Sequence, residues 1–403
     1  MRRSSWCAAV VLALGISACA SSGGSSAGSG RPLVVGVSVS LNGDFSGDGK
    51  ALEQGYDLWA ADVNARGGLL GRKVQMKYVD DASSTQQVVT NYQNLITRDR
   101  VDLTFGPFSS LLTIPSSAVA SRYGYAFPEP AGGGPDVFAH GLKNLFFVQP
   151  APVVSNLVSY TKWLLSLPAS ERPQSAAYAT EDDPFTRPQV DRARSLLEAA
   201  GVKTVYNQVY PAETTDFAPL ALAVAHSGAD GVLLGTQLPD AIAFIQTFRQ
   251  QRFNPKSLVE TTGPDQGSDF SDKVGMANTE GIIVPAGWWP NAKTSQNAHF
   301  VQAFIAKYGG DAASISSDAA EAYSVGQVVE EAAARANSVD NAKLIAQLHT
   351  GTYQTVQGPM AFDRTGQPNG ASFLVQWQGG QTVPVYPTSV AVARPEYPKP
   401  NWQ

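Results

Sequence analysis

Cysteine and histidine are scarce in this sequence, and their scarcity limits the chemistry that the chain can perform. Its 403 residues contain two cysteines, Cys7 and Cys19, both near the N-terminus. The four histidines are far apart, and none shows the i, i+4 spacing of a zinc site on a helix. We therefore expect no disulfide framework and no cysteine- or histidine-ligated metal, and the sequence gives no sign of another cofactor.

Positive charge is also in short supply. The formal charge is −5, and loss of Arg2 and Arg3 with an N-terminal leader lowers it by two, to −7. A nucleic-acid partner is not expected, because nucleic acid requires a surplus of Lys and Arg. The hydrophobic fraction of 43% and the charged fraction of 16% are typical of a globular protein. About 370 folded residues predict two domains.

Apolar runs long enough to span a membrane are missing from the sequence. The chain begins with Arg2 and Arg3, a short apolar stretch at 6–16, and Ser17-Ala18-Cys19. This order is typical of a signal peptide, and its end resembles a bacterial lipobox, in which Cys19 is lipidated. An ordinary signal peptide cleaved nearby is the alternative. Residues 20–32, rich in Ser and Gly, predict a flexible tether, so we expect an extracytoplasmic protein anchored to the cell membrane through Cys19.

Familiar catalytic motifs are absent as well, including G-x-S-x-G, a Walker loop and a G-x-G-x-x-G after the first strand. The string from Ser159 to Lys162 matches the S-x-x-K motif of penicillin-recognising enzymes. Lys293-Thr294-Ser295 resembles their later motif only loosely. We interpret the string as a helical serine beside a surface lysine. The chain is therefore not expected to be an enzyme, and a secreted serine hydrolase is the remaining enzymatic alternative.

The sequence does contain a regular alternation of β-branched runs and helical periodicity. The first series starts with a buried strand at 33–39 and continues to a strand at 125–127. A second series runs from a helix at 155–167 to a strand at 258–261. Later helices are expected at 297–308, 318–336 and 341–348, followed by three short strands. The alternation predicts an α/β fold of two Rossmann-like lobes with parallel-rich sheets.

Several short motifs stand in the order found in one known family. They run from Leu41-Asn42-Gly43-Asp44-Phe45-Ser46-Gly47 through 62–68, 71–73 and 78–82 to 105–110, and G-x-x-x-F-D-x-x-G follows at 358–366. Together they resemble the type I periplasmic binding proteins of the Leu/Ile/Val-binding class, which feed ABC importers. The resemblance implies two lobes joined by three crossovers that hinge shut on a ligand. The implied lobes are 33–150 plus 285–356 and 151–284 plus 357–392, with a C-terminal tail at 393–403.

The resemblance also implies ligand-binding residues in the first lobe. In the family, backbone amides and a serine hydroxyl at a strand-helix turn hold the ligand's carboxylate. Ser110 matches that serine, with Phe108 and Ser109 beside it. A helix-capping role for Ser109 or Ser110 is the alternative reading.

A second implied segment of the first lobe runs through Ala131 and Gly132 to Gly133. Ala131 supplies a matching backbone contact. Gly133 stands where amino-acid binders carry Thr or Ser, so one hydroxyl contact to the ligand is missing. The glycine run 132–134 lets a ligand or the backbone approach closely.

In the second lobe, Phe185 and Gln237 match two family positions that hold a Tyr. Phe185 retains an aromatic ring for stacking on the ligand, whereas Gln237 does not. An acidic residue of the family pairs with the ligand's ammonium, and here it corresponds to Asp265 or to Glu260.

Each of four further residues has two possible interpretations. Asp48 and Asp318 stand at family positions that are aromatic or apolar, where they would meet a cationic or hydroxyl-bearing ligand. Asp48 is otherwise a solvated loop residue, and Asp318 is otherwise a helix N-cap. Trp288 and Trp289 either wall the cleft or pack the hinge, and we favour packing.

Taken with the leader, the resemblance predicts the solute-binding component of an ABC importer. It would act as a monomer that captures an amino acid, an amide or a small carboxylate and presents it to a permease and ATPase complex. The alternative is a ligand-sensing lipoprotein that presents its closed form to a membrane signalling partner. Gly133 and Gln237 argue against a standard branched-chain amino acid.

Overall fold

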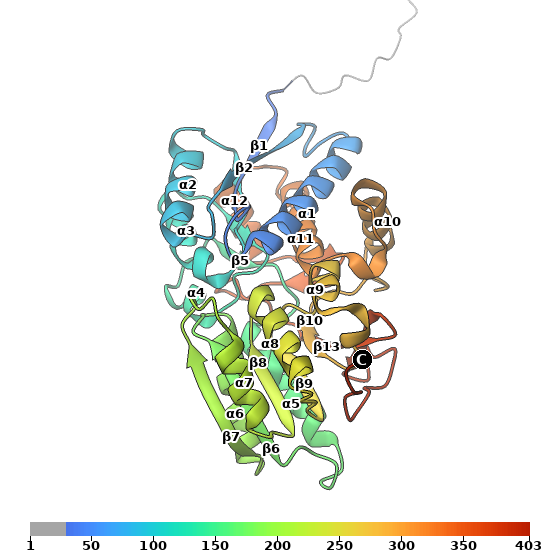
Figure 1. The fold of residues 1–403 in the computed structure, drawn as a ribbon. Helices are drawn as coiled ribbons and strands as arrows, with labels where there is room; N and C mark the ends of the chain where they lie inside the picture. The colour runs from blue at the N-terminus through green and yellow to red at the C-terminus, as the bar shows by residue number, and fades with distance from the viewer. Residues whose placement is uncertain (1–29) are drawn as a thin grey trace, which may run out of the picture.

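The computed structural model describes residues 30–403 and contains two α/β lobes, which lie one above the other in Figure 1. The predicted signal peptide, Cys19 and most of the tether lie outside the described residues, so the expectations about them stay predictions. Within residues 30–403, no helix combines the length and the apolar character needed to cross a membrane.

The first lobe is built on a three-stranded parallel sheet in the order β2-β1-β3. A parallel pair, β4 and β5, continues the layer, and β11 and β12 form a separate antiparallel hairpin. The strands are β1 (Leu33–Val39), β2 (Val74–Asp80), β3 (Leu103–Thr104), β4 (Phe127–Glu129), β5 (Leu145–Phe147), β11 (Thr352–Thr355) and β12 (Gly358–Ala361). The helices are α1 (Ser46–Ala65), α2 (Thr85–Thr97), α3 (Ser110–Arg122), α4 (Pro135–Ala139), α10 (Asn297–Tyr308), α11 (Ser317–Ala336) and α12 (Asn341–Leu348), with a 3₁₀ turn, η3 (Ala312–Ser314).

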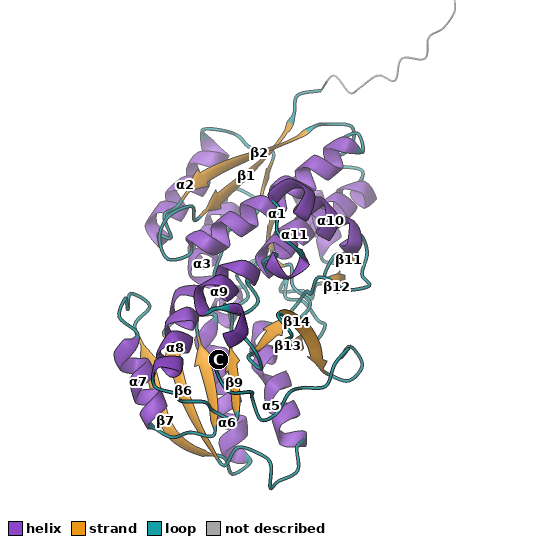
Figure 2. Cartoon of the chain, turned by 45° about the vertical axis from the view of Figure 1, so that its right-hand side comes forward, coloured by secondary structure: helices purple, strands orange, loops and turns teal. Residues whose placement is uncertain are grey.

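The second lobe is built on a seven-stranded sheet in the order β14-β13-β10-β9-β8-β6-β7, parallel except at β13 and β14 (Figure 2). Its strands are β6 (Ser175–Glu181), β7 (Lys203–Tyr210), β8 (Gly231–Gly235), β9 (Ser257–Glu260), β10 (Ile283–Ala286), β13 (Phe373–Gln378) and β14 (Gln381–Tyr386). Its helices are α5 (Asn156–Ser166), α6 (Thr186–Ala199), α7 (Ala218–His226), α8 (Leu238–Gln250) and α9 (Gly267–Val274), with the 3₁₀ turns η1 (Val153–Ser155) and η2 (Met276–Asn278).

Each lobe has its own hydrophobic core, and the chain passes between the cores three times. The core of the first lobe draws on residues 33–153 and 288–362. The buried clusters of the second lobe draw on residues 157–283 and 374–385. The predicted fold class, two α/β lobes joined by three crossovers, is therefore confirmed. The individual lobe boundaries given above stay a prediction.

Helices α1 and α11 pack closely although they are far apart in the sequence, and both views place them side by side. A Cβ atom at Gly326 would lie 2.2 Å from the ring of Trp59, so a larger residue would force the helices apart. The indole of Trp59 is fully buried and donates to Glu330 Oε2 over 3.3 Å. Glu330 also pairs with Arg66 over 2.8 Å. This packing fixes the N-terminal turn of α11 at the boundary between the lobes.

Candidate functional site

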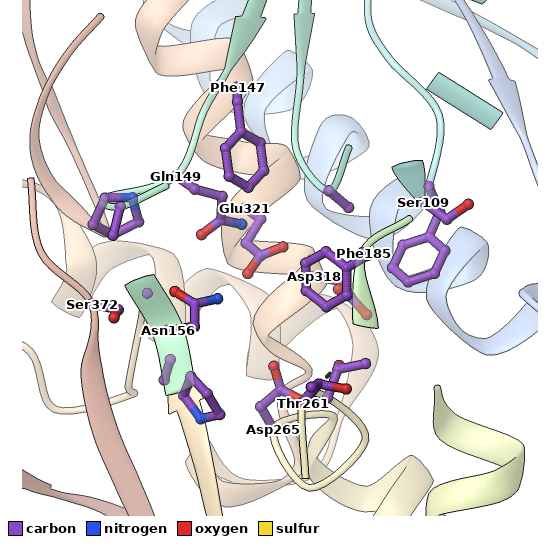
Figure 3. Close-up of a pocket in the computed structure, with 18 of the residues that line it drawn as sticks. Ser109, Phe147, Gln149, Asn156, Phe185, Thr261, Asp265, Asp318, Glu321 and Ser372 are labelled. Carbon is purple, nitrogen blue, oxygen red and sulfur yellow. Dashed lines mark hydrogen bonds between the residues drawn. The ribbon is translucent and has the colours of Figure 1, made fainter. Parts of the chain in front are cut away.

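A cleft between the lobes encloses about 650 Å³ of space that protein atoms do not fill, part of it open to solvent. Aromatic rings and a few polar side chains line it together, as in many small-molecule sites. Its walls come from strand ends and helix N-termini of both lobes (Figure 3). In parallel α/β sheets this is the usual place for a ligand.

Six of the predicted ligand-binding residues line this cleft together. Phe108, Ser109 and Ala131 come from the first lobe, and Phe185, Gln237 and Asp265 come from the second. Asp318, which the sequence left between a ligand contact and a helix cap, also lines the cleft. The N-cap of α11 is Ser316, whose hydroxyl accepts from the Asp318 amide over 3.2 Å.

Ser109 occupies the turn between β3 and α3 in a left-handed conformation, with φ of 71°. Its hydroxyl accepts from the Leu112 amide over 3.4 Å, so it serves as the N-cap of α3 while its residue borders the cleft. Ser110 is fully buried and does not line the cleft. Its hydroxyl accepts from the amide of Gly134 over 2.9 Å and so holds the glycine loop against α3.

The three glycines of the 132–134 run are in contact with protein atoms. A Cβ at Gly132 would lie 2.4 Å from Thr113 Oγ1, and one at Gly133 would lie 2.3 Å from the Phe147 ring. Neither glycine lines the cleft. Phe147, at the end of β5, fills the space beside Gly133 and lines the cleft itself.

Gly134 brings this loop against the second lobe. A Cβ at this position would lie 2.2 Å from the carbonyl oxygen of Pro184, which precedes α6. The backbone of Gly134 is extended, with φ of −61°, so only space and not conformation requires glycine here. The loop after β4 therefore closes one side of the cleft by direct contact between the lobes.

Hydrogen bonds of Asp265 and Gln266 also join the second lobe to the first. Ser317, the first residue of α11, donates its hydroxyl to Asp265 Oδ2 over 2.8 Å and its amide to the Asp265 carbonyl over 3.1 Å. Gln266 donates its side-chain amide to Asp48 Oδ1 over 2.5 Å. Asp48 is buried behind the wall and does not line the cleft. Asp265 therefore touches the cleft and the other lobe at once.

Three carboxyl groups, those of Asp265, Asp318 and Glu321, line the cleft. Burial raises the pKa of Glu321 to about 8, with further contributions from the charges of Asp265 and Asp48. Burial likewise raises the pKa of Asp318 far above its ordinary value, and the neighbouring carboxyls of Asp48 and Glu321 add to the shift. Burial also raises the pKa of Asp265. These groups are costly to ionise together while nothing positive stands between them.

Other candidates from the sequence lie elsewhere. Glu260 is fully buried, does not line the cleft, and burial raises its pKa well above the ordinary value. Trp288 donates its indole N–H to Asn297 over 2.6 Å and packs on Phe300, and neither it nor Trp289 lines the cleft.

The residues of the S-x-x-K string form no site with each other. Ser159 Oγ donates to a backbone carbonyl of Ser372 over 3.5 Å, and Lys162 is exposed. Within residues 30–403, no group of three or more His, Cys, Asp or Glu side chains is arranged to hold a metal ion.

Sequence reasoning missed several lining residues, of which Glu321 bears most directly on charge. Glu321 lies three residues after Asp318, and that spacing on a predicted helix places both on one face. Gln149 and Asn156 add amide groups from the first crossover. No motif marks these two residues, and Phe147 belongs to a strand that the sequence did not predict.

Most of the sequence matches a known family. Residues 32–381 fit the family model described as periplasmic binding protein, so the chain belongs to that family. Its relatives at 24–25% identity are described as Leu/Ile/Val-binding protein homologues, so the chain is similar to that group. These proteins bind solutes and are not enzymes. They work with ABC permeases, and membership implies an extracytoplasmic location.

Among the relatives, Leu/Ile/Val-binding protein homolog 7 of Brucella melitensis is 25% identical, covering 86% of this chain and 89% of its own. Homolog 8 of Brucella abortus is 24% identical over 89% of this chain and 91% of its own. An ABC-transporter solute-binding protein of R. palustris, solved with benzoate, superposes with a TM-score of 0.78 at 20% identity over 90% of this chain and 98% of its own. A branched-chain amino acid transporter substrate-binding protein of Streptococcus pneumoniae, solved with isoleucine, superposes with a TM-score of 0.74 at 20% identity. The match covers 88% of this chain and 100% of that protein. At these identities the structural likeness concerns the fold.

Proposed function

We propose that this chain captures a small polar solute in the cleft between its lobes by hinge closure and delivers it to an ABC importer. The observation that carries the proposal is the contribution of both lobes to one small-molecule cleft. Phe108 and Asp318 come from one side, and Phe185 and Asp265 come from the other. A ligand that touches both lobes favours the closed arrangement, because it interacts with both walls only when they meet.

A thermal-shift screen of the protein without its leader tests this proposal. The screen covers amino acids, amides, amines and small carboxylates. A true ligand raises the unfolding midpoint, and the stabilisation grows with the logarithm of the ligand concentration divided by Kd. Small-angle scattering with and without the ligand measures the expected decrease in radius of gyration. Failure of every solute to stabilise the fold would reject the binding function.

We further propose that Cys19 carries the lipid that anchors the protein, and that the protein acts as a monomer. The order of Ser17, Ala18 and Cys19 after the apolar stretch supports the anchor. Mass spectrometry of the protein extracted from membranes should find diacylglycerol on an N-terminal Cys19. In a Cys19→Ser variant the protein should leave the membrane fraction, and its retention there would refute the anchor.

A further inference from the structure

The ionisable side chains that line the cleft within the described residues are all acidic. Asp265, Asp318 and Glu321 line it, and Asp48 lies behind them against Gln266. None of the described residues that line the cleft is Lys, Arg or His. An anionic ligand would keep these carboxyls protonated, whereas a cation would let them ionise beside an opposite charge.

Helix N-termini attract anions, and three helices that begin at the cleft have a carboxyl group of the chain itself at this end. At the start of α6, Asp183 accepts from the amides of Phe185 and Thr186 over 2.7 Å and 3.2 Å. At the start of α8, Asp240 accepts from the Gln237 amide over 2.7 Å. Asp318 lies in the first turn of α11. Among the helices that begin at the cleft, these three thus have their positive ends compensated from within.

The starts of α3 and α5 differ, because neither first turn holds an acidic residue. At α3, Ser109 accepts from the Leu112 amide and Ser110 accepts from the Gly134 amide. At α5, Asn156 lines the cleft, and the N-cap Ser155 makes no side-chain hydrogen bond to the helix. These two helix starts offer positive potential to a ligand carboxylate, but no Lys, Arg or His of the described lining adds to it.

The cleft also contains a buried polar group that lacks a partner. The hydroxyl of Ser372 is buried, lines the cleft and has no hydrogen-bond partner within the described residues. The side-chain oxygen of Gln237, which also lines the cleft, faces the Asp240 amide in the capping box of α8. A buried polar group without a partner is costly, so the Ser372 hydroxyl calls for a polar ligand.

Aromatic rings complete the site. Phe108 and Phe147 line the cleft from the first lobe, and Phe185 lines it from the second (Figure 3). Aromatic faces accept the apolar body of a ligand and attract an ammonium group through the ring quadrupole. Carboxyls and aromatic rings together suit an organic cation better than an inorganic one.

From these observations we propose that the cleft selects a small organic amine, with its ammonium group at Asp318 and Glu321 and its apolar body against the phenylalanines. The inference rests on the proposed binding function and narrows it, because a cation is chosen over the zwitterions and carboxylates that the sequence left open.

Benzylamine, phenylalanine and benzoate form a matched test set, because they share a phenyl ring and differ in charge at neutral pH. Isothermal titration of the protein without its leader should give a Kd for benzylamine at least tenfold below those of the other two. A tenfold difference in Kd corresponds to about 1.4 kcal/mol of binding free energy. Glu321→Gln and Asp318→Asn should each weaken benzylamine at least tenfold and leave benzoate unchanged or tighter. Glu171→Gln, which removes an equal charge from an exposed site on the second lobe, should change neither.

The outcomes separate this inference from the function on which it rests. Tighter binding of benzoate or phenylalanine than of benzylamine overturns the inference and leaves the binding function intact. Benzylamine binding that survives both substitutions in folded variants overturns the placement at Asp318 and Glu321. If benzylamine fails while another amine from the screen binds and responds to Glu321→Gln, the proposal holds. If no solute of any charge binds, the function itself is rejected.

Discussion

Closure of the lobes depends on the small size of residue 134, and Gly134→Ala measures that dependence. The added Cβ would lie 2.2 Å from the Pro184 carbonyl oxygen, whereas ordinary contacts start at 3.4 Å, so the loops must separate by about 1.2 Å. Because the φ of −61° suits alanine and the Gly134 amide remains free to bond Ser110, the lobes themselves should fold normally. The free-energy cost of the added methyl group is therefore expected in the closed arrangement of the lobes.

Overpacking of this kind costs about 1–3 kcal/mol, which corresponds to roughly 5- to 160-fold weaker ligand binding. Isothermal titration with the tightest solute from the thermal-shift screen measures the change, and small-angle scattering measures the accompanying increase in radius of gyration. Gly231→Ala is the matched control, since its Cβ would meet nothing closer than Pro173 Cβ at 3.4 Å. Binding and scattering equal to the parent protein in a folded Gly134→Ala variant would show that the ligand does not require these loops to meet.

Three further results are expected. The folded pKa values of Glu321 and Glu129, each about 8, lie above the ordinary 4.5, so the folded state holds protons that the unfolded state releases. Stability should therefore fall as pH rises from 4.5 to about 8, and differential scanning calorimetry should show a smaller fall in Glu321→Gln. Ser110→Ala removes the acceptor of the buried Gly134 amide and should lower the unfolding free energy by about 1–3 kcal/mol in urea titrations; lost binding with unchanged stability would instead indicate direct contact with the ligand. Phe185→Ala should weaken the screened ligand about tenfold by titration, and unchanged affinity would exclude the ring from the contact.

Much of the fold was predictable because its elements have strong periodicity. The strand at Leu33–Val39 and the helices at Asn297–Tyr308 and Asn341–Leu348 have the residues that the sequence predicts. The missed elements are short or depend on tertiary packing. Among them, β5 has three residues, and α9 is held by the burial of Phe270 and Val274 in the core of the second lobe.

The site residues were predictable only where the residue type has a single structural role at that position. Ser110 illustrates the limit, because a serine beside a helix start can face a ligand or bond its own backbone, and here its hydroxyl bonds Gly134. Gly133 illustrates a second limit. A missing side chain suggests free space, but Phe147, from a strand 12 or more residues later in the chain, fills it. Which atoms occupy a gap is a property of the folded chain and not of the local sequence.

The packing of α11 on α1 also bears on the order in which the molecule is completed during synthesis. Trp59 and Glu330 lie 271 residues apart, so at ribosomal rates of about 5–20 residues per second roughly 14 to 54 s separate their appearance. The strands β6 to β10 of the second lobe appear within that interval. The first lobe therefore waits for most of the second lobe to be synthesised, and a chain that stops before residue 317 leaves the α11-facing side of α1 without its partner.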